Sequence, residues 1–201
     1  LMTKDGHLVV GHDPVINPQI CLHKDGKIID QKFVVFHKTL VEVQELDCGS
    51  LVNERFPNAI RIPGTPMPTL EEVFALVRNS SHDKSKTVGF NLETKFSDEH
   101  PLEDSPHPRE FAQALVRSIE NSGFSLDRFI IQSFVWETLK ISKEINPNIK
   151  TAVLFGVPTF DIWSRIEALK PDIISPGHYK ITKRFVDRAK LKGYPVVPWT
   201  A

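Results

Sequence analysis

Residues 129–155 read FIIQSFVWETLKISKEINPNIKTAVLF, and this stretch decides the fold class. It contains an apolar run at Phe129–Ile131, an amphipathic segment, an Asn146-Pro147 stop and a second apolar run at Ala152–Phe155. Short apolar runs bounded by turn residues are typical of buried strands, and the residue before a proline favours the end of a helix. The stretch therefore predicts a strand–helix–strand unit.

The same unit recurs on both sides of this stretch. Further apolar runs lie at Thr87–Leu92, Asp172–Ile174 and Pro195–Val197, and the last four runs begin at nearly even intervals. The amphipathic segments between them repeat apolar residues at helical spacing: Phe111, Leu115 and Ile119, then Ile162, Ile166 and Leu169, then Phe185 and Ala189. Such alternation predicts an α/β fold with a parallel sheet. Because no glycine-rich fingerprint follows a strand, a TIM (β/α)8 barrel is favoured over a doubly wound dinucleotide-binding sheet.

The part of the chain before residue 70 has a different character. Residues 15–66 show no sustained periodicity, and more than fifty residues are too many for an idle loop in a compact domain. We expect these residues to form an insertion beside the mouth of the barrel. After it, Thr69 and Glu72 have the spacing of a capping box, which predicts the start of a helix.

Composition limits the class of protein. The chain has 201 residues, equal numbers of basic and acidic side chains and no window apolar enough for a transmembrane helix. This balance argues against nucleic acid or an anionic membrane as an electrostatically driven partner. Cys21 and Cys48 are too few for a disulfide framework; free structural thiols are favoured, and a single bridge between them remains open. Both ends lack the character of natural termini, so we expect an internal piece of a longer chain.

The strongest chemical signal is Gly89–Lys95, which reads GFNLETK. Alternate residues of a strand share a face, so Asn91, Glu93 and Lys95 are expected to line up. A buried carboxylate needs a cation or hydrogen-bond donors, and a divalent metal at Glu93 with an anionic substrate at Lys95 would meet that need. An edge strand, or a plain Glu93–Lys95 ion pair, explains the pattern equally well.

A second candidate group follows the apolar residues Leu8–Val10. His12 stands at the expected carboxyl end of a strand, where barrel enzymes place their catalytic residues, and imidazole is suited to proton transfer near neutral pH. The alternative is an ordinary histidine in a surface turn. If the first interpretation holds, the side chains of Glu93 and Lys95 project into the barrel within reach of His12.

Several short motifs along the chain together carry a family resemblance. They occur in the order TKDG at 3–6, VVxHDP at 9–14, PTLEEV at 68–73 and NxExK at 91–95, and the likeness continues through QSF at 132–134, SPGH at 175–178 and VPWT at 197–200. In this order they resemble the glycerophosphodiester phosphodiesterase family. The resemblance implies a TIM barrel of the phospholipase C-like phosphodiesterase type, with residues 1–201 forming one partial domain that includes the insertion 15–66.

The resemblance also implies an activity and the residues that perform it. Members hydrolyse glycerophosphodiesters to sn-glycerol 3-phosphate and an alcohol, in glycerol and lipid metabolism. By position, His12 matches a histidine that acts as general acid, and Glu93 matches one of three carboxylates around a divalent ion, Ca²⁺ or Mg²⁺. Lys95 matches a phosphate-binding residue, and Trp199 matches an aromatic residue near the glycerol side of the pocket.

Other family features are absent from these residues. A His-Arg-Gly strand and an E-x-D acidic pair are expected upstream of Leu1, and the last strand is expected beyond Ala201. Such a truncated barrel would expose unpaired parallel edges. We therefore expect residues 1–201 alone to be inactive.

Two alternatives remain open. One is a lipid phosphodiesterase resembling sphingomyelinase D or phosphatidylinositol phospholipase C, which is disfavoured because the sequence suggests neither an exposed aromatic cluster nor a basic rim. The other is a non-catalytic barrel used for binding or scaffolding. The expected partner is a small-molecule glycerophosphodiester, without nucleic acid or stable membrane insertion, and the resemblance is to bacterial proteins of the cytoplasm or periplasm.

Overall fold

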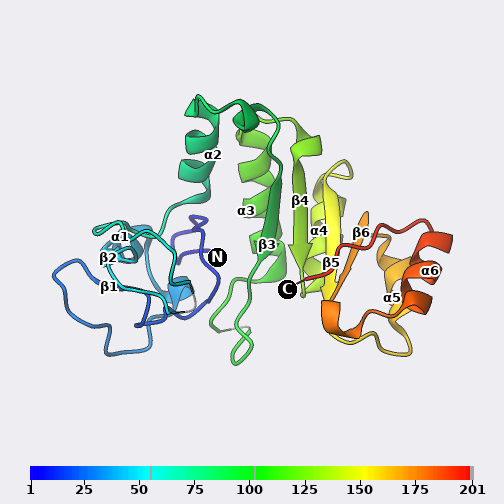
Figure 1. Ribbon diagram of the computed structural model, residues 1–201, viewed down its shortest axis with the longest axis horizontal. Helices are drawn as coiled ribbons and strands as arrows, with labels where there is room; N and C mark the ends of the chain where they lie inside the picture. Colours follow the sequence, from blue (N-terminus) through cyan, green and yellow to red (C-terminus); the bar gives the residue numbers. More distant parts are fainter. Residues whose placement is uncertain (55, 102, 200–201) are drawn as a thin grey trace. The chain divides into compact units, whose positions relative to one another are not determined.

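The computed structural model describes residues 1–54, 56–101 and 103–199. These residues form two compact units (Figure 1). The first unit contains Leu1–Ser81 and Lys95–His107, and the sheet unit contains His82–Thr94 and Pro108–Ala201.

The sheet unit is built on four parallel strands in the order β3-β4-β5-β6 (Figure 1). The strands are β3 (Phe90–Thr94), β4 (Phe129–Ser133), β5 (Lys150–Phe155) and β6 (Ile173–Pro176). In β5 every residue after Lys150 is buried, as expected of a strand covered on both faces. The parallel order confirms the strand–helix alternation that the sequence predicts.

Helices follow the strands as the apolar spacing predicts. They are α3 (Pro108–Asn121), α4 (Trp136–Ile145), α5 (Ile162–Leu169) and α6 (Lys183–Leu191), with short 3-10 turns η2 (Asp83–Lys86), η3 (Leu126–Arg128) and η4 (His178–Lys180). The apolar stripe Phe111, Leu115 and Ile119 of α3 is buried, and α3 packs against α4, which also packs on β4 and β5. Thr182 caps α6 through its hydroxyl, which accepts from the Phe185 amide at 3.2 Å.

Two predicted strands differ from those observed. The run at Thr87–Leu92 becomes strand only from Phe90, because Thr87 ends the η2 turn with a backbone hydrogen bond to Lys84 and Val88 is exposed. The run at Pro195–Val197 lies beside β6 through parallel bridges Ile174↔Val196 and Gly177↔Trp199, without a continuous ladder. It occupies the position of the next strand in the sheet.

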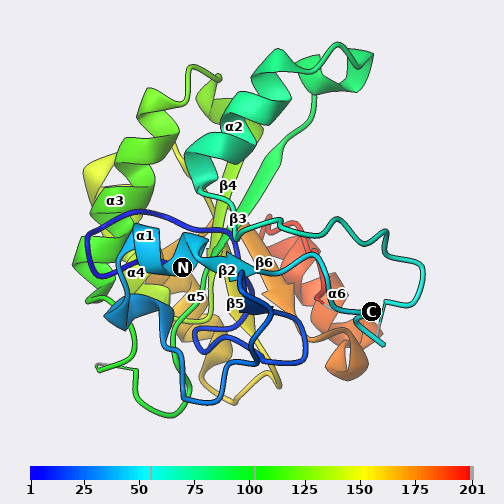
Figure 2. The same cartoon turned by 90° about the vertical axis from the view of Figure 1, so that its left-hand side faces the viewer.

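The first unit has little regular structure (Figure 2). Its elements are β1 (Leu22–His23), η1 (Val35–His37), α1 (Leu40–Gln44), β2 (Leu46–Asp47) and α2 (Leu70–Asn79), and β1 pairs with β2 antiparallel. The capping box predicted for α2 is confirmed: Thr69 Oγ1 accepts from the Glu72 amide at 3.1 Å, and the Thr69 amide donates to Glu72 Oε2 at 2.7 Å.

The predicted strand at Leu8–Val10 is wrong. These residues make isolated antiparallel bridges instead, Met2↔Leu8 and Val9↔Thr69, so they are not a strand of the parallel sheet. Their apolar character serves burial, because Leu8 and Val9 point into the interior of the first unit.

The insertion carries its own core and a disulfide. Buried side chains between residues 16 and 46, among them Ile16, Phe33, Val43 and Leu46, form one cluster. Cys21 and Cys48 are joined as a disulfide within this cluster, so the expectation of free thiols is wrong. The two halves of the insertion pair through β1 and β2, which brings the two sulfurs together.

Asp47 organises the loop that follows the disulfide. Its carboxylate accepts from the amides of Gly49, at 2.9 Å, and Gly64, at 2.9 Å, and from the Ser50 hydroxyl at 2.6 Å. These hydrogen bonds lower the pKa of Asp47 to about 2, with the Ser50 hydroxyl the largest cause. The loop therefore closes around an ionised side chain.

Within the described residues, no helix has both the length and the apolar character needed to cross a membrane.

Candidate active site

His12 and Lys95 meet in the first unit. Lys95 Nζ lies 2.9 Å from His12 Nε2, although the two residues are 83 positions apart in the chain. The imidazole is open to solvent, with 78% of the side chain exposed. An ammonium donates and cannot accept, so Nε2 is the acceptor of this hydrogen bond. The structure thus brings the Lys95 ammonium and the His12 imidazole into contact, and their catalytic roles stay predictions.

The other ring nitrogen of His12 is bonded to its sequence neighbour. Asp13 Oδ1 accepts from Nδ1–H at 2.7 Å, which fixes the tautomer with the proton on Nδ1. Asp13 directly follows His12 in the sequence. Their hydrogen bond depends on the local backbone conformation, so the sequence alone does not predict it. The preceding Gly11 allows close packing, because a Cβ there would lie 2.9 Å from Met67 Cε.

Glu93 lies in the sheet unit, at the carboxyl end of β3. Its register partner in β4 is Gln132, whose Nε2 donates to Glu93 Oε2 at 3.4 Å. Gln132 Oε1 accepts from Asn91 Nδ2 at 3.0 Å. Asn91 and Glu93 therefore share a face, as the alternation predicts, and Gln132 links them. The opposite face is buried, and there Thr94 Oγ1 donates to Ser133 Oγ at 2.8 Å.

Trp199 lies beside the carboxyl end of β6. Its Nε1 donates to the Phe155 carbonyl at 3.0 Å, and its amide donates to the Pro176 carbonyl at 3.1 Å. The indole contacts Phe134 edge-on at 5.0 Å and Tyr179 at 6.4 Å between ring centroids. Trp199 is thus the centre of an aromatic cluster of three rings: Phe134, Tyr179 and Trp199.

Sequence reasoning did not anticipate this aromatic cluster. Phe134 is 46% exposed and Tyr179 is 58% exposed, and Phe160 in the loop after β5 is also open to solvent. The expectation that exposed aromatic residues are lacking is therefore wrong. Sequence position could have predicted the cluster, because Phe134 directly follows the last residue of β4 and Tyr179 follows β6 within a few residues.

The described residues do not by themselves form a metal site. Across residues 1–54, 56–101 and 103–199, no three His, Cys, Asp or Glu side chains gather closely enough to hold an ion. Glu93 is one carboxylate with an amide neighbour, which is fewer ligands than Ca²⁺ or Mg²⁺ takes from proteins and water combined. The residues present therefore do not fit a complete divalent-metal site.

Comparison with protein families gives one match over the whole chain. The profile of the Glycerophosphoryl diester phosphodiesterase family matches residues 1–201. A glycerophosphodiester phosphodiesterase of Caldanaerobacter subterraneus subsp. tengcongensis is 27% identical over 199 residues, which cover 99% of this chain and 70% of that protein. Another, from Bacillus subtilis, is 31% identical over 155 residues, 76% of this chain and 46% of that protein.

Solved structures agree on the fold. A candidate glycerophosphoryl diester phosphodiesterase of Silicibacter pomeroyi matches with a TM-score of 0.86 and 22% identity, covering all of this chain and 70% of that one. An Oleispira antarctica phosphodiesterase in complex with the product sn-glycerol-3-phosphate matches with a TM-score of 0.75 and 20% identity, with the same coverage. The predicted TIM (β/α)8 fold class is confirmed by these likenesses.

Proposed function

Because the chain belongs to the glycerophosphoryl diester phosphodiesterase family, whose members are phosphoric diester hydrolases, we propose that the full-length protein hydrolyses glycerophosphodiesters. The products are sn-glycerol 3-phosphate and an alcohol, and the former is the product named for the Oleispira antarctica structure. The observation that carries the proposal is the contact between Lys95 Nζ and His12 Nε2.

This contact matches the chemistry of an anionic diester. The Lys95 ammonium is placed to neutralise the negative charge that grows on the phosphoryl oxygens as the bond between phosphorus and the departing alcohol oxygen breaks. When a phosphate oxygen takes the Lys95 hydrogen bond, His12 Nε2 is released to carry a proton. His12 takes a proton on Nε2 from solvent, and Asp13 keeps the ring oriented through Nδ1. As a water molecule attacks phosphorus and the bond between phosphorus and the alkoxide oxygen breaks, His12 acts as the general acid and gives that proton to the departing oxygen, while the attacking water loses a proton to solvent.

Substrate-binding roles are proposed for the sheet unit. Trp199 offers a partly exposed ring, fixed at Nε1 by the Phe155 carbonyl, for the carbon skeleton of the glycerol moiety. Glu93 is proposed as one ligand of a divalent ion, Ca²⁺ or Mg²⁺, whose remaining ligands lie outside the described residues. No step described above depends on that ion.

A lipid substrate is the second candidate. The exposed rings of Phe134, Tyr179 and Phe160 favour it, because apolar surface of this kind suits acyl chains better than a small polar alcohol. Such an enzyme would resemble sphingomyelinase D or phosphatidylinositol phospholipase C in acting on lipid. A non-catalytic barrel has no comparable observation in its favour.

One assay separates these functions. The full-length protein is incubated with glycerophosphocholine, glycerophosphoethanolamine and glycerophosphoinositol, and with vesicles containing sphingomyelin or phosphatidylinositol, with and without EDTA. We expect sn-glycerol 3-phosphate from at least one soluble diester and its loss with EDTA. Hydrolysis of vesicle lipid alone would favour the second candidate, and no hydrolysis of any substrate would contradict both.

We also propose an oxidising location for the protein. Disulfides persist outside the reducing cytosol, and the Cys21–Cys48 disulfide lies in the core of the insertion. This favours export over the cytoplasm in a bacterium. Trapping free thiols in intact cells before lysis tests the point: alkylation of both cysteines in the native host would contradict it.

A further inference from the structure

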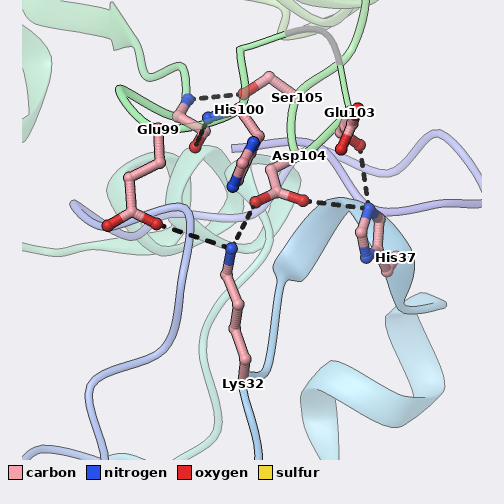
Figure 3. Close-up of polar contacts among 8 residues, drawn as sticks. Lys32, His37, Glu99, His100, Glu103, Asp104 and Ser105 are labelled. Atoms are coloured by element: carbon pink, nitrogen blue, oxygen red, sulfur yellow. Dashed lines mark hydrogen bonds and ion pairs between the residues drawn. The ribbon is translucent and has the colours of Figure 1, made fainter.

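Asp104 is a buried carboxylate that the proposed chemistry does not use. Only 6% of its side chain is exposed, and its two oxygens point to different side chains, those of Lys32 and His37 (Figure 3). Oδ2 accepts from Lys32 Nζ at 2.8 Å, and Oδ1 lies 3.4 Å from His37 Nε2. The Lys32 hydrogen bond, followed by nearby positive charge, lowers the pKa of Asp104, so the group is ionised at neutral pH.

Asp104 belongs to the segment that begins at Lys95. The segment 95–107 is held together internally, because Ser105 Oγ accepts from the Ser97 amide at 2.6 Å and Ser97 Oγ accepts from the His100 amide at 3.1 Å (Figure 3). A displacement of Asp104 and Ser105 is therefore passed to the start of the segment.

The partners of Asp104 belong to a second segment, 32–37. Its other edge pairs with the residues that follow His12: the Val35 amide donates to the Pro14 carbonyl at 3.0 Å, and the Ile16 amide donates to the Phe33 carbonyl at 2.9 Å. Segment 32–37 is thus attached on one edge to the chain carrying His12. Asp104, together with the Glu103 carbonyl that lies 2.9 Å from His37 Nε2, attaches it to the chain carrying Lys95.

A small cavity marks where these segments meet. It has a volume of about 10 Å³, room for a single water molecule, and Pro14, Val35, Lys95 and Asp104 are among its lining residues. Lys95 and Asp104 therefore both line the same small cavity.

We propose that Asp104 is a positioning residue for the reaction: its ion pair with Lys32, supported by His37, fixes segment 95–107 on segment 32–37 and so sets Lys95 Nζ against His12 Nε2. The expected effect on KM rests on the proposed function, whereas the effect of Asp104 on the position of Lys95 does not. Loss of the ion pair lets Lys95 move away from His12, and small displacements of groups around a reacting centre are costly in rate.

The kinetic test uses the full-length protein with Asp104→Asn and Lys32→Met. Lys32 is half-exposed, so Lys32→Met creates no cavity in the core and serves as the second variant if Asp104→Asn unfolds the chain. We expect the KM for the diester to rise about 10-fold in each. The rise in the double variant should be less than additive, because both changes remove the Lys32–Asp104 contact, although Lys32→Met also removes the 3.7 Å pair with Glu99 and Asp104→Asn the ionic contact with His37. Lys32→Arg keeps the pair and should restore the wild-type KM. Lys27→Met, which removes the exposed Lys27–Asp25 pair of the same insertion, is the matched control and should leave KM unchanged.

A merely structural role predicts a different result. Partial unfolding lowers the concentration of active enzyme and hence the apparent kcat, with KM unchanged. An unchanged KM in both Asp104→Asn and Lys32→Met would therefore overturn the proposal.

A crystallographic test is independent of activity. In Asp104→Asn and Lys32→Met crystals, we expect Lys95 Nζ to lie beyond hydrogen-bond distance of His12 Nε2. Lys95 still hydrogen-bonded to His12 in both variants would overturn the proposal. If the wild-type protein hydrolyses no diester, the proposed function fails, and this measurement still decides the positioning role.

Discussion

His12 is held at both nitrogens of its ring, by Asp13 at Nδ1 and by Lys95 at Nε2. Replacing it with alanine removes the proposed general acid, and we expect kcat of the full-length enzyme to fall by roughly 10²–10⁴. The measurement is the rate of sn-glycerol 3-phosphate release at saturating substrate. His7→Ala, an exposed histidine of the same unit, is the control and should keep the wild-type rate. An unchanged kcat in His12→Ala would remove His12 from the mechanism.

Asp47 makes the stability of the first unit depend on acid. Its pKa is lowered to about 2 in the folded chain, against an ordinary value near 4, so its hydrogen bonds stabilise the fold fully above about pH 4. That contribution is lost as pH falls through about 2, because protonation removes the ionised acceptor.

This argument predicts how Asp47→Asn compares with the wild type. At pH 7 the variant should unfold at lower urea concentration than the wild type, and the difference should shrink between about pH 4 and pH 2. Urea titrations across that range measure it. A difference that stays constant down to pH 2 would show that the carboxylate charge is not what closes the loop.

For single residues, the sequence predicts which side chains belong to the candidate site better than it predicts which side chains they contact. The alternation of Asn91 and Glu93 predicts their common face, and the H-D motif singles out His12. The ion pair of Lys32 with Asp104 joins residues 72 positions apart, and no local pattern records such a pair. The aromatic cluster was missed for the same reason, since its rings come from three separate loops after strands.

The disulfide is the main device of the insertion. It closes a loop between residues 27 positions apart, and the chain-entropy account gives such a cross-link about 3 to 4 kcal/mol of stability. We expect the variant with Cys21→Ser and Cys48→Ser to lose roughly this free energy of unfolding, measured by denaturant titration. Equal stability of the wild type and the double variant would contradict this role.

Elements were predictable where apolar periodicity is strong. The apolar stripe of α3 and the cap of α2 at Thr69 are both confirmed. The apolar residues Leu8–Val10 were misread because a short apolar run suits isolated antiparallel bridges as well as a parallel strand; only Leu8 and Val9 of the three are buried. The sequence of the insertion has no apolar periodicity, because its backbone is held by a disulfide and by side chains such as Asp47.

For the molecule as a whole, the family and hydrolase class predicted from motif order are confirmed. The single-domain description of residues 1–201 stays a prediction, and so do the roles of the site residues. The order of the motifs predicted the family because the motifs are spread over the entire chain, whereas each motif alone is too short to be specific.

We expect residues 1–201 expressed alone to be inactive. His12 lies beside Lys95, and among the described residues no cluster of three metal-ligating side chains is present. The measurement is release of sn-glycerol 3-phosphate by this piece and by the full-length protein under identical conditions. Metal-stimulated turnover by the piece would show that the chemistry needs fewer groups than the resemblance implies.

The setting of Trp199 gives the molecule an intrinsic optical reporter. Its indole is anchored by the Phe155 carbonyl and flanked by two exposed rings, whereas Trp136 donates to the Leu154 carbonyl and Trp163 is buried. With Trp136 and Trp163 replaced by phenylalanine, the remaining fluorescence comes from the carboxyl ends of the strands. Emission from that single indole would follow ligand arrival in real time, without any label or turnover.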